Sequence, residues 1–120
     1  MAEDSPYKVL IFLKRRPGMS VEEFRDYYEN HHRPLVEKYS AGLSRYVRRY
    51  LEPLPHLDTK EMSEPEFDVV TELWCANREA FDDLLNMVKF GTLLPEVLED
   101  EERIFDHPRT RQVYLTECEG

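Results

Sequence analysis

Apolar and polar residues follow strand and helix periodicities along the chain, in an order that predicts the fold. β-Branched and aromatic residues form four extended stretches, whereas apolar residues recur every three or four positions in three others. The predicted strands are 7–14, 43–51, 67–74 and 110–117, and the predicted helices are 21–39, 78–90 and the shorter 93–105. Strand, helix, strand, strand, helix, strand is the order of the split βαβ arrangement. We therefore predict one domain over 1–120 of the α+β class, a ferredoxin-like βαββαβ fold with a four-stranded antiparallel sheet and its helices on one face.

Two of the predicted strands are apolar on both faces. The stretches 7–14 and 67–74 carry large apolar side chains at odd and even positions alike, which is typical of strands covered on two sides. Helices on one side of the sheet would leave the other side bare, and a bare apolar face of this size requires a partner. We expect a homodimer in which two sheets pack face to face.

The helix at 21–39 has the clearest start signal in the chain. Ser20 and Glu23 have the spacing of a capping box, in which each side chain accepts a hydrogen bond from the other residue's backbone N–H. The apolar stripe of this helix contains Val21, Phe24, Tyr28, Leu35 and Tyr39. Pro34 lacks an N–H and disfavours helical angles at Arg33, so we expect the helix to kink or end there.

Two adjacent histidines, His31 and His32, flank this stripe just before Pro34. One interpretation is structural: the ring packs in the core and donates its N–H to a carbonyl freed by the proline. The other is catalytic, because an imidazole titrates near neutral pH and can exchange protons with a ligand. Tyr28 lies one helical turn before His32, so these two side chains are expected to be neighbours.

The composition excludes several classes of function. The net charge of −9 argues against nucleic acid as a partner, since phosphate binding requires a cationic face. No apolar run is long enough to span a bilayer, and Glu3 and Asp4 stand where a signal peptide would be basic, so we expect a cytoplasmic protein without membrane contact. The two cysteines, four histidines and four glycines show no metal-ligand spacing and no phosphate-binding loop. We expect neither a metal nor a cofactor.

Two further stretches have distinctive compositions. The run 96–102 holds five carboxylates in seven residues, which is typical of a solvated helix face. Residues 52–66 contain three prolines and no periodicity, and we interpret them as a loop long enough to act as a lid.

The blocks 8–20 and 22–35, of which His32-Arg33-Pro34 is the most specific part, precede the other features of the site. These two blocks resemble the opening of the EthD group of the dimeric α/β-barrel proteins. Later blocks that resemble the group are Ser44-Arg45-Tyr46, Phe67-Asp68 and Glu72-Leu73-Trp74, and the likeness covers about 7–117. The chain is similar to the fungal dehydratases and decarboxylases of aromatic polyketide pathways. This resemblance implies a cofactor-free dimer, a pocket between helices and sheet, an aromatic ligand, and His32 as the general acid/base.

The residue types suited to proton transfer and to binding an aromatic ligand define the predicted site. The predicted catalytic residues are His32, Tyr28 and Tyr46, and the predicted substrate-binding residues are His31, Arg48, Asp68, Trp74 and His107. Decarboxylation needs protonation at carbon, whereas dehydration needs a base at the α-carbon and an acid for the leaving hydroxyl. A histidine with a tyrosine or carboxylic acid partner serves either reaction.

We therefore expect a cofactor-independent lyase, a decarboxylase or a dehydratase, that acts on an aromatic polyketide-type substrate. Decarboxylation is slightly favoured, because Arg33, Arg45 and Arg48 offer ways to recruit an anionic substrate. The alternatives are a non-catalytic dimeric binding or accessory protein that uses the same pocket, and a cofactor-free oxygenase of the anthrone type.

Overall fold

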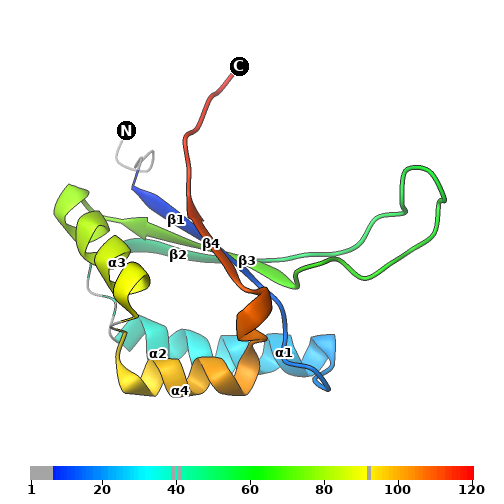
Figure 1. Ribbon diagram of the computed structural model, residues 1–120, viewed down its shortest axis with the longest axis horizontal. Helices are drawn as coiled ribbons and strands as arrows, with labels where there is room; N and C mark the ends of the chain where they lie inside the picture. Colours follow the sequence, from blue (N-terminus) through cyan, green and yellow to red (C-terminus); the bar gives the residue numbers. More distant parts are fainter. Residues whose placement is uncertain (1–6, 39, 41, 92) are drawn as a thin grey trace.

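The computed structural model describes residues 7–38, 40, 42–91 and 93–120 (Figure 1). Its strands are β1 (Lys8–Leu13), β2 (Leu43–Tyr50), β3 (Val69–Cys75) and β4 (Arg111–Tyr114). Its helical elements are α1 (Val21–Tyr27), the π-helical turn η1 (Tyr28–His32), α2 (Arg33–Lys38), α3 (Arg78–Phe90), α4 (Pro95–Ile104) and the 3-10 turn η2 (His107–Arg109). Glu3, Asp4 and Tyr39, on which part of the sequence interpretation rested, lie outside the described residues.

The strands form one antiparallel sheet in the order β2-β3-β1-β4. The predicted ferredoxin-like topology is confirmed, with α3 and α4 both placed between β3 and β4. Figure 1 shows the helices gathered on one side of the sheet. Opposed residues of neighbouring strands share a face, so the register divides the sheet into an inner face toward the helices and an outer face. The inner face contains the rows Tyr46–Leu73–Val9–Tyr114 and Arg48–Thr71–Ile11–Gln112.

The start of α1 is fixed by the predicted capping box. Ser20 Oγ accepts a hydrogen bond from the Glu23 N–H at 3.1 Å, and Glu23 Oε1 accepts one from the Ser20 N–H at 3.0 Å. These bonds satisfy backbone donors that have no partner inside the helix.

We expect Ser20→Ala to lower the free energy of unfolding by about 1 kcal/mol, because the Glu23 N–H loses its acceptor. Urea denaturation of the two proteins measures this difference. Ser63→Ala is the matched control, since Ser63 is exposed between β2 and β3, and it should leave the unfolding free energy unchanged. Equal losses in the two variants would contradict the capping role.

The helix does not end at Pro34, and the prediction of non-helical angles at Arg33 is wrong, because Arg33 has φ −57° and ψ −51°. The turn η1 accommodates the proline: the Arg33 N–H bonds to the Tyr28 carbonyl, five residues back. With the same five-residue spacing, an N–H at position 34 would donate to the Glu29 carbonyl, but proline has no N–H. Arg33 Nε donates to that oxygen instead, at 2.9 Å. Turns of the π type are rare and frequently occur at functional sites.

The core lies at one end of the space between helices and sheet. Its buried members are Leu13, Phe24, Tyr28, Val69, Ile104 and Phe105. The rings of Phe24, Tyr28 and Phe105 meet edge to face, with centroids 5.6–6.2 Å apart. At the other end, none of the described side chains of α3 is fully buried. The apolar side of α3 therefore borders a hollow rather than the packed core.

Candidate functional site

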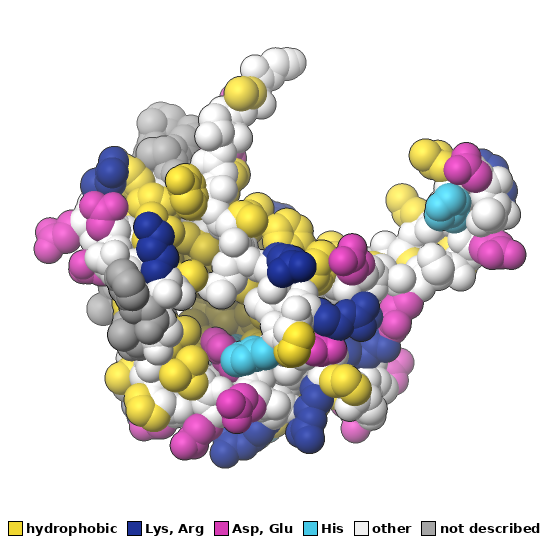
Figure 2. Space-filling view, in the orientation of Figure 1, with side chains coloured by type: hydrophobic (Ala, Val, Ile, Leu, Met, Phe, Trp, Pro, Cys, Tyr) yellow, Lys and Arg dark blue, Asp and Glu magenta, His cyan; other side chains and the backbone are white. Residues whose placement is uncertain are grey.

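A pocket of about 510 Å³ lies between the inner face of the sheet and the helices α2, α3 and α4. Its apolar lining includes Ile11, Leu43, Leu73, Leu84, Val88, Leu94 and Val97. Its polar lining includes Tyr28, His32, Tyr46, Thr71, Glu101, His107, Thr110 and Gln112. Figure 2 shows the hollow, with hydrophobic side chains at its floor. A mostly apolar cavity of this volume with a few convergent polar groups is typical of a small-molecule site.

Residues 52–66, which we name the arm, contribute nothing to the described lining of the pocket. The pocket lies near Leu43 and Cys75, whereas the arm begins where β2 ends and returns where β3 begins, at the opposite end of these strands. Figure 1 shows the arm extending away from the helices. In this structure the arm therefore does not cover the pocket of its own chain.

His32 is the buried imidazole of the pocket. It comes from η1, is 3% exposed, and its Nδ1 lies 2.8 Å from Asp100 Oδ2 on α4. Its ring packs edge to face against Tyr28 and Phe105, with centroids 5.3 and 5.1 Å away. These contacts fix the plane of the His32 ring. Asp100 contacts Nδ1, and the other ring nitrogen, Nε2, does not take part in that contact.

Asp100 is placed to orient this imidazole. Its Oδ1 accepts a hydrogen bond from the Tyr27 hydroxyl at 2.5 Å, while Oδ2 faces His32. Burial alone would raise the pKa of Asp100, but the hydrogen bonds from Tyr27 and His32 hold it below its ordinary value. An ionised Asp100 stabilises the tautomer with the proton on Nδ1. His32 Nε2 then carries a lone pair, as a general base requires.

Three hydroxyl groups form a chain along the wall of the pocket beside His32. The Tyr46 hydroxyl donates to the Tyr28 hydroxyl at 3.0 Å, and the Tyr28 hydroxyl lies 2.6 Å from Thr71 Oγ1. Burial raises the pKa of Tyr28 to about 12, although its bonds with Thr71 and Tyr46 act in the other direction. Burial and the neighbouring Tyr28 raise the pKa of Tyr46 as well. Both phenols are therefore neutral at pH 7 and can donate hydrogen bonds.

Glu101 brings a second proton-transfer group to the pocket. It follows Asp100 on α4, and its Oε1 lies 3.3 Å from His107 Nε2. Burial raises the pKa of Glu101 above its ordinary value and outweighs the lowering effects of His32 and His107. A raised pKa widens the pH range in which Glu101 keeps its proton, and the protonated carboxyl is the form that can act as a general acid.

The sequence interpretation missed Asp100 and Glu101, because the run 96–102 was taken as a solvated face. The helical periodicity of this run could have shown that two of its carboxylates lie on the buried side. Asp100 lies three residues after Val97, and Glu101 lies three before Ile104, so both follow the helical spacing of the buried pair. Two carboxylates on the apolar stripe of an acidic helix would have indicated a site.

Four of the predicted substrate-binding residues do not line the pocket: His31, Arg48, Asp68 and Trp74. His31 is exposed, and its ring stacks on Tyr27 with centroids 4.8 Å apart, because the π turn directs only His32 inward. Arg48 pairs with Glu29, with Nε and Nη2 each 2.9 Å from a carboxylate oxygen. It therefore reinforces the contact between β2 and η1 instead of facing a ligand.

Asp68 and Trp74 belong to the outer face of the sheet. Asp68 pairs with Arg15 at 2.6 Å. The Trp74 indole donates to Glu72 at 2.9 Å, with Lys8 Nζ 3.9 Å from its ring centroid. Burial alone would raise the pKa of Glu72, but hydrogen bonds from Arg49 and Trp74 hold it below its ordinary value. Asp68 and Trp74 therefore pair with other side chains on the outer face and do not line the pocket.

The predicted residues that the fold brings together are Tyr28, His32, Tyr46 and His107, all of which line the pocket. The described residues contain no group of three or more His, Cys, Asp or Glu side chains arranged to hold a metal ion. No helix in the described parts of the chain combines the length and apolar character needed to cross a membrane.

The fold and the site together define a ferredoxin-like α+β protein with an apolar pocket beside a buried imidazole–carboxylate pair. The model of the EthD domain matches residues 16–108, and the chain belongs to this family. A comparison with curated proteins gave no match.

The solved structures that share the fold include the following two. An EthD-like protein from Ralstonia eutropha JMP134 is 21% identical, with a TM-score of 0.54 over 82% of this chain and 80% of that one. HapK from Hahella chejuensis is 11% identical, with a TM-score of 0.50 over 94% of this chain and 96% of that one. At these identities the likeness concerns the fold.

Proposed function

We propose that the protein is a cofactor-independent lyase that acts on an aromatic polyketide-type substrate by histidine general acid/base catalysis. One observation carries the proposal: Nδ1 of the buried His32 lies 2.8 Å from Asp100 at a mostly apolar pocket, and Glu101, whose pKa is raised by burial, lines the same pocket. A base and an acid in one mostly apolar cavity suit proton transfer on a planar substrate that is already activated. The resemblance of the sequence to fungal polyketide dehydratases and decarboxylases supports the same substrate class.

The charge of the pocket favours loss of water over loss of carbon dioxide. Among the described residues that line the pocket there is no lysine or arginine. Arg48, on which the preference for decarboxylation partly rested, pairs with Glu29. A substrate carboxylate would therefore enter a pocket in which no described lysine or arginine offsets its negative charge. A neutral β-hydroxy ketone fits this environment better.

In the proposed dehydration, His32 Nε2 removes the proton on the carbon between the ketone and the hydroxyl-bearing carbon. The electrons of the C–H bond form an enolate, whose oxygen accepts a hydrogen bond from the hydroxyl chain of Tyr28, Tyr46 and Thr71. The enolate re-forms the ketone and expels the hydroxyl group, which leaves as water with the proton of Glu101. The proton on His32 then returns to Glu101, so that no oxidant or reductant is required.

Product analysis by mass spectrometry tests the proposal. Purified protein is incubated with neutral β-hydroxy ketones fused to aromatic rings and, separately, with the corresponding aromatic carboxylic acids. A product lighter by one water from the ketones supports dehydration. Loss of carbon dioxide from the acids would contradict dehydration and indicate a decarboxylase. A gain of oxygen would indicate an oxygenase. Binding without turnover in either series would indicate an accessory binding protein.

We expect Tyr46→Phe to lower kcat by about tenfold, because the hydroxyl chain that faces the enolate loses one neutral hydrogen bond. Tyr50→Phe is the matched control. The Tyr50 hydroxyl donates to Glu29 at 2.6 Å, and Tyr50 is not among the pocket residues. Steady-state kinetics should show the loss in the first variant alone. Equal loss in both variants would mean that the hydroxyls act through folding.

A further inference from the structure

The carboxylate of Asp100, which contacts the proposed base His32, is held from its other side as well. Asp100 is 5% exposed. Its Oδ2 lies 2.8 Å from His32 Nδ1, and its Oδ1 accepts a hydrogen bond from the Tyr27 hydroxyl at 2.5 Å. Arg103 Nη1 lies 3.5 Å from the same Oδ1. Residues of α1, η1 and α4 therefore meet at this one carboxylate.

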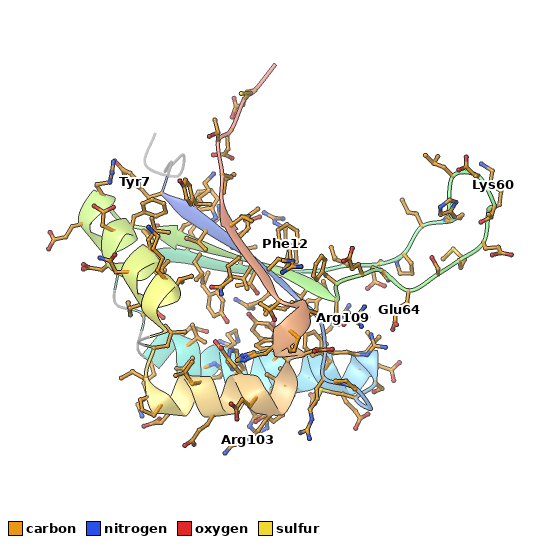
Figure 3. All side chains as sticks on the ribbon, in the orientation of Figure 1. Tyr7, Phe12, Lys60, Glu64, Arg103 and Arg109 are labelled. Carbon is orange, nitrogen blue, oxygen red and sulfur yellow. The ribbon has the colours of Figure 1, made fainter. Side chains whose placement is uncertain are left out.

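Arg103 holds Asp100 weakly. Its side chain is 60% exposed, and its other terminal nitrogen, Nη2, lies 4.0 Å from the exposed Glu99. Figure 3 shows Arg103 on the side of α4 that is turned away from the sheet. Solvent screens the charge of an exposed arginine, so an ion pair at such a distance contributes little. The position of Asp100 therefore depends mainly on its other donor, Tyr27.

The Tyr27 hydroxyl holds Asp100 strongly, because its hydrogen bond ends on a charged oxygen in a buried position. Burial and the contact with Asp100 raise the pKa of Tyr27, so this hydroxyl keeps its proton at neutral pH and donates it. Burial alone would raise the pKa of Asp100, but the bonds from Tyr27 and His32 lower it. Donor and acceptor are thus both in the charge state that the Tyr27–Asp100 bond requires.

Two consecutive tyrosines act on the imidazole from different sides. Tyr28 packs its ring edge to face against His32, with centroids 5.3 Å apart, and lines the pocket. Successive residues of a helix point about 100° apart, and Tyr27 is not among the described residues of the pocket lining. Tyr27 therefore reaches His32 through Asp100.

We propose that Tyr27 is a positioning residue of the site: its hydroxyl holds the Asp100 carboxylate beside Nδ1 of His32, which keeps the lone pair on Nε2. This role rests on the proposed function, in which Nε2 is the base. Without the hydroxyl, the carboxylate would turn more freely about its Cβ–Cγ bond and lose its alignment with the imidazole N–H. It would also attract protons more strongly, because no buried donor would share its charge. The Asp100–His32 pair should then bind its proton more tightly.

Nitrogen-15 NMR of the histidine ring measures this effect without turnover. The full chain is labelled with ¹⁵N-histidine, and the His32 signals are assigned by their absence from His32→Asn. We expect the titration midpoint of His32 to move to higher pH by about one pH unit in Tyr27→Phe. The charged groups that face Asp100, namely His32 and Arg103, stay in place in this variant, as does the neighbouring Glu101.

Tyr50→Phe is the matched control for the NMR experiment. It removes another tyrosine hydroxyl that donates to a carboxylate, that of Glu29 at 2.6 Å, and Tyr50 is not among the described pocket residues. The His32 midpoint should stay unchanged in this control, and Arg103→Gln should move it by less than Tyr27→Phe does. Replacing Tyr27 by a tyrosine with one fluorine on the ring makes the hydroxyl a stronger donor and should move the midpoint to lower pH.

Turnover gives a second measurement. In Tyr27→Phe we expect kcat to fall by about tenfold with KM unchanged, because Tyr27 positions the base and does not touch the substrate. An unshifted His32 midpoint in Tyr27→Phe, or a larger shift in Arg103→Gln, would overturn the role of Tyr27. Failure of the proposed function has a different signature: the wild type turns over no substrate, while the midpoint still moves in Tyr27→Phe.

Discussion

His32→Asn should lower kcat by about 10²- to 10⁴-fold, because it removes the nitrogen that we propose as the base. The side-chain amide of asparagine can place an N–H near the position of Nδ1, where His32 contacts Asp100 at 2.8 Å. Asp100 therefore keeps a hydrogen-bond partner in the variant. KM should change little, since the aliphatic walls of the pocket remain. Rapid-quench measurement of product formation gives the rate of the chemical step.

His31→Asn is the control for this prediction. His31 is exposed and stacks on Tyr27 outside the pocket, so its replacement should leave kcat near the wild-type value. A larger loss in His31→Asn than in His32→Asn would show that the wrong imidazole was assigned. Equal activity of folded His32→Asn and wild type would restrict His32 to a structural role.

Glu101→Gln should lower kcat by about 10²-fold, because the leaving hydroxyl loses its proton donor. The variant also tests the pH dependence. Burial raises the pKa of Glu101, so the wild type should lose activity as pH rises through this raised pKa and the acid ionises. Glutamine cannot titrate, and the alkaline fall due to Glu101 should disappear from the pH–rate profile of the variant. An unchanged alkaline limb would exclude Glu101 as the acid.

Measurements of the free energy of unfolding show whether the loss of kcat in Glu101→Gln comes from the missing acid or from a destabilised fold. A carboxyl whose pKa is raised in the folded state stabilises the fold while it is protonated, and that contribution is lost as pH rises from the unfolded pKa through the folded one. Glu101→Gln should therefore be at least as stable as the wild type at neutral pH. Glu99→Gln is the matched control, because Glu99 is exposed on the same helix, and it should change neither kcat nor the pH–rate profile. A loss of activity in both variants would mean that the charge of the helix is responsible.

The order of elements was predictable because its signals are local. The capping box of Ser20 and Glu23, the cap of Asn77 on α3 and the left-handed Gly91 after it depend on residues within one turn of each other. In the strands, side chains at every second position likewise share a face, so this too can be predicted from neighbouring residues. The fold class, the place of Tyr28 on the apolar stripe of its helix and the shared strand face of Tyr46 and Arg48 followed from these short-range patterns.

The site depended on contacts between residues far apart in the sequence. His31 and His32 are equivalent by simple helical spacing, and the π turn around Pro34 together with Asp100, 68 residues later, directs only His32 inward. Packing of α4 against η1 likewise buried Asp100 and placed Glu101 at the pocket, although both belong to an acidic run. Tertiary pairing also drew Arg48 to Glu29. The sequence by itself determined the elements and their faces, whereas only the tertiary structure decided which charged groups share an enclosed space, because burial and partner choice depend on how distant segments pack.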